Sequence, residues 1–268
     1  MEKKFKLGVI GGGFMATAII NGAIDSGVLN KEQLIVSDIS ATSLEKFANN
    51  GIATTTDNVF LATNAEFVLF AVKPQSISDV LQTIKGCDCE KFISIMAGVK
   101  KQRIKDVFKT SKVARCMPNT PCSISSGAIG LDTTDFDNID DKTFITSLLS
   151  ALAKVVLVDE SKLNAVTGVS GSSPAYFYLF LKGVIDAGVK QGLSEQDAKT
   201  LAVNTMIGAG KMVLANPEKS LDDLINAVCS KGGTTIEAVN VFKDNGLDKI
   251  TDKAIDACVK RAFELENL

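Results

Sequence analysis

Residues 6–20 read KLGVIGGGFMATAII, an apolar run that ends in three glycines and continues into a second apolar stretch. From Gly11 to Ala16 it fits G-x-G-x-x-A, the spacing of a turn between a strand and a helix. Gly11 permits the tight turn, Gly13 has no β-carbon to obstruct a pyrophosphate, and Ala16 is small enough for close helix packing. Free N–H groups at the helix start would hold the phosphates. The stretch predicts a dinucleotide site, the alternative being a purely structural turn.

The same stretch also has the outline of a secretory signal peptide. MEKKFK is basic, an apolar segment follows, and Ala16-Thr17-Ala18 imitates a cleavage site. Consecutive glycines interrupt the apolar segment, however, and a strand–turn–helix pattern continues beyond it. No apolar run reaches the roughly 18 residues of a membrane span. We therefore expect a folded, cytoplasmic protein without a membrane segment.

The first half of the chain alternates short apolar runs with helical patterns. This rhythm is typical of a parallel sheet with helices on both faces, the context that strengthens a glycine motif. The expected strands cover residues 6–10, 33–37, 67–72, 92–96, 113–117, 127–131 and 154–158. The expected helices cover residues 14–26, 42–49, 75–85, 101–109 and 141–152. We predict an α/β, Rossmann-like N-terminal domain.

From about residue 161 the strand signals disappear. The expected helices there cover residues 173–191, 195–214, 221–228, 234–244 and 247–265. We predict two domains, a dinucleotide-binding domain at residues 1–160 and an all-α domain at residues 161–268. The second domain is small and its helices are very apolar, so we expect it to bury them against a second copy as a homodimer. The alternative is a self-sufficient helical bundle.

Charge and composition exclude several classes of function. The formal net charge is −2 at pH 7, which lacks the basic footprint of a nucleic-acid binder. The chain has no histidine, and its six cysteines have no common zinc-binding spacing, so we expect reduced thiols and no metal. The acidic run 132–142 lacks the glycine and terminal glutamate of a calcium loop, and a solvated connection with an aspartate helix cap is expected. A solvated helix face is likewise expected for Lys100, Lys101, Arg103 and Lys105.

The end of the second expected strand bears on the cofactor. Asp38 stands where an acid usually accepts a hydrogen bond from the ribose 2′-hydroxyl, which favours NAD(H). Nearby hydroxyls could instead bind a 2′-phosphate, with Lys46 as the nearest cation downstream. These hydroxyl residues are Ser37, Ser40, Thr42 and Ser43. The residues alone leave NADPH and NADH open.

Several further motifs follow in order along the chain. They are IGGGFMATAI (10–19), FAVKPQ (70–75), ISIMAGV (93–99), RCMPNTP (115–121), SGSSPAYFY (170–178), DAGVKQGL (186–193) and SKGGTTIEA (230–238). With them the chain resembles the pyrroline-5-carboxylate reductase family almost end to end. The resemblance implies reduction of the cyclic imine 1-pyrroline-5-carboxylate to L-proline, the last step of proline biosynthesis, with NADPH preferred over NADH. It also implies a helical dimerisation domain, a substrate site near the dimer interface and further assembly of dimers into rings.

Carried over position by position, the resemblance implies two sets of site residues. The cofactor would contact Gly11, Gly12, Gly13, Phe14, Met15, Ala16, Ser37, Asn58, Ala71, Val72, Lys73, Pro74, Ala97 and Gly98. The substrate would contact Met117, Pro118, Asn119, Ser230, Gly232, Gly233, Thr234 and Thr235. Thr235 matches the hydroxyl donor proposed for the family, which makes it the expected catalytic residue.

The chain departs from the family pattern at three positions. Ser173 and Lys231 replace a glycine and a proline of the usual motifs, which could change loop stiffness or substrate affinity. Lys182 replaces an acidic residue. A β-hydroxyacid dehydrogenase, the first rival interpretation, would need a catalytic lysine such as Lys182, although no matching motif surrounds it. A second rival is a regulator that binds the cofactor without catalysis.

The chemistry implied by the resemblance does not require histidine. A protonated imine accepts hydride without a strong enzymic acid, whereas alcohol dehydrogenases commonly use histidine or lysine. Gly232, Gly233 and the free N–H groups of the helix expected at 234–244 could cradle a carboxylate, with the Thr235 hydroxyl on the ring nitrogen. The alternative is an ordinary cap in which Thr234 or Thr235 bonds its own helix. Cys229, beside this loop, could make the enzyme sensitive to thiol reagents.

Overall fold

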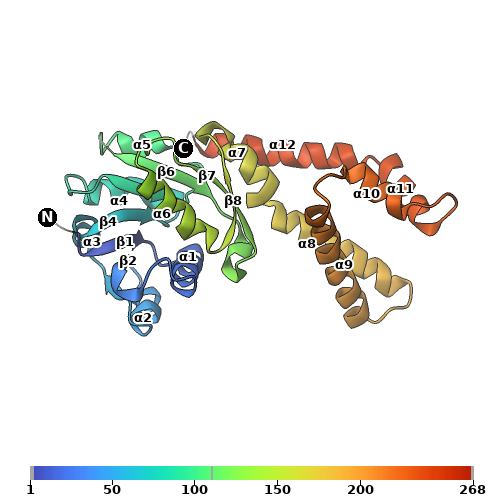
Figure 1. The fold of residues 1–268 in the computed structure, drawn as a ribbon, viewed down its shortest axis with the longest axis horizontal. Helices are drawn as coiled ribbons and strands as arrows, with labels where there is room; N and C mark the ends of the chain where they lie inside the picture. Colours follow the sequence, from blue (N-terminus) through green and yellow to red (C-terminus); the bar gives the residue numbers. More distant parts are fainter. Residues whose placement is uncertain (1–2, 110, 267–268) are drawn as a thin grey trace. The chain divides into compact units, whose positions relative to one another are not determined.

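The structure, a computed structural model, describes residues 3–109 and 111–266. Within these residues one sheet of eight strands has the order β3-β2-β1-β4-β5-β6-β7-β8 (Figure 1). Neighbouring strands are parallel except β6 and β7, which are antiparallel. The strands are β1 (Phe5–Ile10), β2 (Leu34–Ser37), β3 (Ala53–Thr55), β4 (Ala65–Phe70), β5 (Lys91–Ser94), β6 (Lys112–Met117), β7 (Gly127–Asp132) and β8 (Ala153–Leu157).

Helices cover both faces of this sheet. One core lies under α1 (Phe14–Asp25), α2 (Ala41–Ala48) and α6 (Ile139–Ser150). The other lies under α3 (Asn58–Asn64), α4 (Ile77–Thr83) and α5 (Lys101–Lys105). Alternate residues of β4 feed the two cores, since Phe67 belongs to the first and Phe70 to the second. Each large apolar side chain buried in this way contributes about 1.5–3 kcal/mol, and the predicted α/β class is confirmed.

Two elements of the first half were missed by the sequence prediction. β3 has only three residues, all at least partly exposed, so it shows no apolar periodicity. α3 is also short, and Asp57 caps it by accepting hydrogen bonds from the amides of Val59 (2.8 Å) and Phe60 (3.0 Å). Elements this short are fixed by packing on the sheet and by a local cap, not by a long pattern.

Part of the acidic run packs against part of the lysine cluster, so the expectation of a solvated surface was wrong for Lys101 and Asp132, although Lys100, Asp137 and Asp140 are exposed as expected. Lys101 is only 7% exposed, and its Nζ lies 2.9 Å from the carboxylates of Asp132 and Asp135. Burial opposes the charge on Asp132, but the hydrogen bonds from Lys101 and Thr134 and the positive charge of Lys101 together outweigh it and hold the pKa of that carboxyl below its usual value. The cap of α6 is Asn138, not an aspartate. The sequence prediction treated each charged run alone and did not include the ion pairs between the two runs.

By packing, the chain divides into two compact units. The first unit comprises the chain up to Pro174 and again from Cys258, and the second unit comprises Ala175–Ala257. The domain boundary near residue 160 stays a prediction. Beyond the sheet come α7 (Leu163–Val166), a π-helical turn (Thr167–Gly171), α8 (Ser173–Lys190), α9 (Glu195–Ala215), α10 (Leu221–Val228), α11 (Thr234–Asp244) and α12 (Leu247–Leu265).

The second unit has almost no interior of its own. Every one of its residues is described, and Ala198 is its one buried hydrophobic residue. Large apolar side chains lie exposed, including Leu179 at 73% and Leu201 at 58%. An apolar surface of this extent usually marks an interaction site. Among the helices of the described residues, none is both long enough and apolar enough to cross a lipid bilayer.

Candidate active site

The glycine turn after β1 is held close to its neighbours. Gly11 has φ +101°, a left-handed conformation that favours glycine, and its amide donates to the Ser37 carbonyl at 2.7 Å. A β-carbon on Gly11 would lie 2.7 Å from the carbonyl oxygen of Ala71. The turn at β1 is therefore fixed against the ends of β2 and β4.

The next residues leave the start of α1 open. Gly12 donates its amide to Asp38 Oδ2 at 2.7 Å, whereas a β-carbon on Gly13 would meet nothing within 4 Å. Gly13 caps α1 without a side chain, and no acidic residue follows in the first turn. Ala16 is only 1% exposed and packs in the core beneath the helix. Unpaired amides and the positive end of the helix dipole thus face open space, which suits a phosphate.

The end of β2 shows what Asp38 does. Its second oxygen, Oδ1, accepts from the Ser40 amide at 2.8 Å, so both carboxylate oxygens hold main-chain amides. Ser37 donates its hydroxyl to Asn58 Oδ1 at 2.5 Å, which joins two residues expected near the adenosine ribose. Lys46 donates to the Thr17 hydroxyl at 3.1 Å. The carboxylate that would favour NAD(H) is thus already occupied in shaping the turn.

The cofactor candidates from Ala71 to Gly98 follow the carboxyl ends of β4 and β5, beside the glycine turn. The strand order reverses at β1 and β4, and ligands of open α/β sheets bind at such a switch point. Ala71 bonds back to β1, its amide donating to the Ile10 carbonyl at 2.9 Å, and Lys73 lies exposed at the start of a short 3-10 turn. The structure therefore brings together the cofactor candidates from Gly11 to Gly98 at one edge of the sheet.

Gly98, however, is buried by a part of the chain that the sequence prediction did not consider. It has φ +71°, and a β-carbon on it would lie 2.8 Å from the β-carbon of Leu265. Nothing in the sequence pattern pairs these two distant segments, so Leu265 was missed. Contact of Gly98 with a cofactor stays a prediction.

Asn119 is a structural connection as well as a substrate candidate. It is 9% exposed, its Oδ1 accepts from the Ala128 amide at 3.0 Å, and its Nδ2 donates to the Ser170 carbonyl at 3.2 Å. Its side chain therefore joins the loop after β6 to β7 and to the π-helical turn. Ser173, the departure from the family motif, donates to the Gly168 carbonyl at 3.0 Å in that same turn.

Met117 and Pro118 lie beside Asn119 at the end of β6, and the remaining substrate candidates lie in the second unit, at the start of α11. Gly232 has φ +72°, and the Gly233 amide donates to the Ser230 carbonyl at 3.0 Å. Gly233 is the N-cap and provides no side chain, so the alternative in which Thr234 or Thr235 caps the helix was wrong. Thr235 is exposed at the second helical position. The helix start thus offers free amides together with a hydroxyl.

The lysine required by the rival dehydrogenase interpretation has no special surroundings. Lys182 is 72% exposed on α8 and forms an ion pair with Asp186, one turn further along the helix. Exposed ion pairs of this kind contribute little and do not shift a lysine toward acid–base catalysis. The geometry gives no support to Lys182 as a catalytic group.

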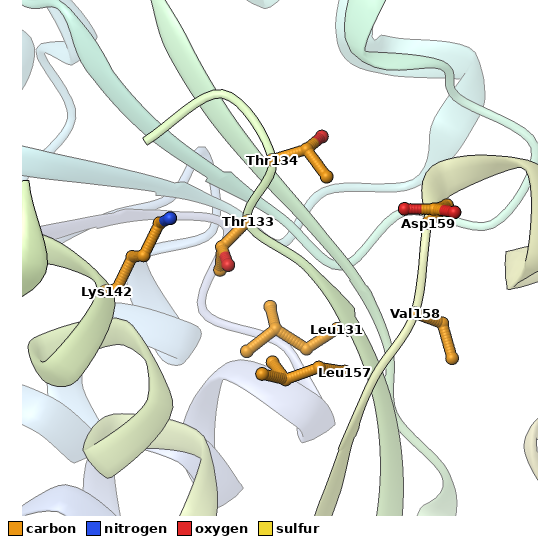
Figure 2. Close-up of a pocket in the computed structure, with 7 residues that line it drawn as sticks. All are labelled: Leu131, Thr133, Thr134, Lys142, Leu157, Val158 and Asp159. Carbon is orange, nitrogen blue, oxygen red and sulfur yellow. The ribbon is translucent and has the colours of Figure 1, made fainter. Parts of the chain in front are cut away.

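A pocket of about 330 Å³ lies elsewhere on the first unit. Figure 2 shows Lys142 and Asp159 on opposite sides of two leucines, Leu131 and Leu157. None of the candidate site residues lines it. Its mixed lining has no convergent set of donors or acceptors, so the candidate active site is not this pocket.

The fold and the open start of α1 define an NAD(P)H-dependent oxidoreductase with a Rossmann-type domain. Comparison with family models agrees. The model described as NADP oxidoreductase, coenzyme F420-dependent, matches residues 6–98. The model described as pyrroline-5-carboxylate reductase dimerisation matches residues 160–265.

Comparison with similar named proteins shows to which family of NAD(P)H-dependent oxidoreductases the chain belongs. A pyrroline-5-carboxylate reductase of Haemophilus influenzae is 40% identical and covers 97% of both chains. The enzyme of that name from Methanosarcina acetivorans is 33% identical, also over 97% of both. The chain belongs to the pyrroline-5-carboxylate reductase family.

Solved structures of the family have the same fold. The pyrroline-5-carboxylate reductase of Coxiella burnetii matches with a TM-score of 0.90 and 34% identity, over 98% of this chain and 99% of that one. A pyrroline carboxylate reductase of Plasmodium falciparum, solved with NADP bound, matches with a TM-score of 0.87 and 27% identity, over 99% and 100%. The resemblance seen in the sequence is confirmed, and the roles of individual site residues stay predictions.

Proposed function

We infer that this chain is a pyrroline-5-carboxylate reductase, which adds hydride from NADPH to the cyclic imine of 1-pyrroline-5-carboxylate and forms L-proline, the last step of proline biosynthesis. The observation that carries the substrate assignment is the start of α11, where a glycine cap leaves main-chain amides free beside the Thr235 hydroxyl. A small carboxylate fits such amides. NADH is the alternative donor.

The first unit would hold the cofactor. The free amides of the first turn of α1 would bind the pyrophosphate, and Gly13 leaves space for it. Ser37 and Asn58, already bonded to each other, would border the adenosine ribose. The segments after β4, β5 and β6 would border the nicotinamide end. Bound NADPH supplies the hydride, and the residues of this unit orient it.

The second unit would hold the substrate. Amides at the start of α11 would bind its carboxylate, and the Thr235 hydroxyl would donate a hydrogen bond to the electron pair that develops on the ring nitrogen as hydride adds. With the imine protonated, hydride adds to the carbon of the C=N bond and the electron pair of that bond goes to nitrogen. The product is a secondary amine, and no further proton is needed at the reacting centre. This chemistry suits a chain without histidine.

Most of the rate would come from placement. Holding the donor and the imine carbon at about 3–3.5 Å supplies several kcal/mol of barrier reduction, because a bimolecular step becomes effectively unimolecular. The Thr235 hydrogen bond adds a smaller electrostatic contribution.

The working form that we propose is a cytoplasmic homodimer, with dimers further assembled into rings, and without a metal, nucleic acid or membrane as partner. The exposed apolar side chains of the second unit support the dimer, since the unit buries little within its own chain. The match to a dimerisation model over residues 160–265 supports it as well.

The decisive assay uses purified protein, pyrroline-5-carboxylate and each cofactor in turn, followed by nicotinamide absorbance and by detection of proline. We expect oxidation of NADPH with stoichiometric proline, and slower turnover with NADH. Oxidation of hydroxyacids in place of imine reduction would favour the dehydrogenase alternative. Saturable cofactor binding without turnover of any cyclic imine would show a protein that only binds NADPH.

A further inference from the structure

The end of α12 packs against the loop between β5 and α5, within the first unit. From Cys258 onward the chain belongs to this unit, and Ala262 is only 6% exposed. The next turn brings Leu265 against Gly98, at the short distance described above. Because of this contact and its φ of +71°, Gly98 accepts no side chain. The contact with Leu265 by itself therefore requires a glycine at this position.

The neighbouring residue, Glu266, links strand β6 to the end of the same loop. Its Oε1 lies 3.1 Å from Arg115 NH1, and both side chains are only 4% exposed. Its Oε2 lies 3.4 Å from Lys100 Nζ. Arg115 pairs in register with Ser94, the last residue of β5, and Lys100 directly precedes α5. One carboxylate therefore binds beside the residue where the loop begins and at the residue where it ends.

Charge-assisted bonds of this kind are hard to replace once water is excluded. Arg115 also contacts Glu160 Oε1 at 3.1 Å, so its guanidinium is shared between two carboxylates. Removing one of them leaves a buried charge less well compensated. Ala97 lies in the loop that leads from β5 to Lys100, and it is half-buried. Gly98 beside it is covered by Leu265.

We propose that Leu265 and Glu266, at the end of α12, are positioning residues for the loop from Met96 to Lys100 and thereby for cofactor binding. The proposal rests on the proposed function, since that places Ala97 against the nicotinamide end of NADPH. Neither residue touches the cofactor. The last turn of α12 and the residue after it set the conformation of a loop that does.

The test is steady-state kinetics of Glu266→Gln, which keeps the size of the side chain and removes its charge. The matched control is Glu264→Gln on the same helix, because Glu264 is 48% exposed and pairs with Arg261 at 2.8 Å. We expect the KM for NADPH to rise about tenfold in Glu266→Gln, with the KM for the imine and kcat within about twofold, as for loss of a charged hydrogen bond. The control should match the wild type.

A second variant keeps the test decisive if Glu266→Gln folds poorly. Lys100 is 52% exposed, so Lys100→Met should fold normally and raise the KM for NADPH about threefold through the loss of one contact. An unchanged KM for NADPH in a folded Glu266→Gln or in Lys100→Met would overturn the proposal. Equal rises of both KM values would also overturn it, because they would indicate general destabilisation.

Ala97→Leu separates failure of this proposal from failure of the proposed cofactor site. A higher KM for NADPH in Ala97→Leu, with normal values in the Glu266 and Lys100 variants, would leave the cofactor site standing and refute the positioning role. An unaffected KM for NADPH in Ala97→Leu would refute the placement of the loop at the cofactor, and the positioning role with it.

Discussion

In the part of the chain that the structure describes, two helices begin at a glycine instead of a capping side chain, and they lie in different units. α1 begins after Gly13 and α11 after Gly233, and neither has a side-chain cap. By contrast, α6 is capped by Asn138 and α9 by Ser194. A start without a side chain leaves its amides to another acceptor, and we assign the pyrophosphate to the first and the substrate carboxylate to the second.

The two starts differ in what supports them. Beneath α1, Ala16 is buried in a core and Gly12 is bonded to Asp38. In α11 no residue is buried. The proposed pyrophosphate site at α1 thus lies within one unit that has its own core. The proposed carboxylate site at α11 belongs to a unit whose large apolar side chains are exposed. We therefore expect NADPH binding to survive changes that abolish substrate binding.

The largest effect should come from preventing assembly. Leu179→Asp places a charge on an exposed apolar stretch of α8, and burying that charge in a dimer would weaken association by about 1,000-fold. At low protein concentration turnover should be lost while NADPH still binds. Sedimentation, cofactor fluorescence and kinetics measure the three quantities. The control is Ile139→Asp in the first unit, where the side chain is 71% exposed. If Leu179→Asp remains dimeric and active, the substrate site does not depend on assembly through α8.

The next largest effect concerns the hydroxyl at the start of α11. Thr235→Ala should lower kcat/KM for the imine by about 10- to 1,000-fold, as for a lost transition-state hydrogen bond, with NADPH binding unchanged. Thr235→Ser should retain most of the activity. Thr251→Ala is the control, because that hydroxyl bonds the Leu247 carbonyl of its own helix at 2.7 Å. Turnover of Thr235→Ala close to that of the wild type would refute the role.

A smaller effect, on NADPH and not on the imine, should follow from placing a side chain at the start of α1. Since a β-carbon on Gly13 meets nothing in the protein, Gly13→Val should fold with an unchanged melting temperature. It should raise the KM for NADPH about 30-fold by obstructing the pyrophosphate, a cost of about 2 kcal/mol. Gly233→Ala is the counterpart, since its β-carbon would meet the Ser230 hydroxyl, and it should raise the KM for the imine alone. If both variants change the same KM, the two starts do not have separate ligands.

The smallest effect concerns the thiols of the two units. Burial raises the pKa of Cys116 to about 12, so at pH 8 it stays protonated and should resist alkylation. Cys229 is half-buried beside α11 and should react faster, lowering activity a few-fold. Mass spectrometry locates the label, and Cys229→Ser is the control that should lose this sensitivity. Full activity after complete alkylation of Cys229 would exclude an effect at the substrate site.

The α/β fold of the first unit and the family could be predicted from the sequence, because short, local patterns encode them. The turn from Gly11 to Ala16 and the alternation around it predicted the cofactor unit, and the ordered motifs predicted the family. The continuous SKGGTT motif likewise predicted that Thr235 lies at the start of a helix, while its catalytic role stays a prediction. A fold unit or family that is encoded in local patterns and continuous motifs can therefore be predicted from a single chain.

The features that were missed depend on residues far apart in the chain. Lys101 seemed solvated until the fold placed Asp132 and Asp135 beside it. The contact of Leu265 with Gly98 was likewise not expected, while the cofactor contact of Gly98 stays a prediction. In both cases a charge or a glycine has its reason in a partner more than 30 residues away, and no periodicity encodes that partner.

We propose that main-chain amides at the start of α11 hold the substrate, while those at the start of α1 hold the cofactor. A crystal structure with NADP and proline bound is the sharpest test. We expect the proline carboxylate at about 2.9 Å from the amide nitrogens around Thr234 and Thr235, with its ring nitrogen on the Thr235 hydroxyl. Proline bound by side chains away from α11, or a pyrophosphate away from α1, would contradict it.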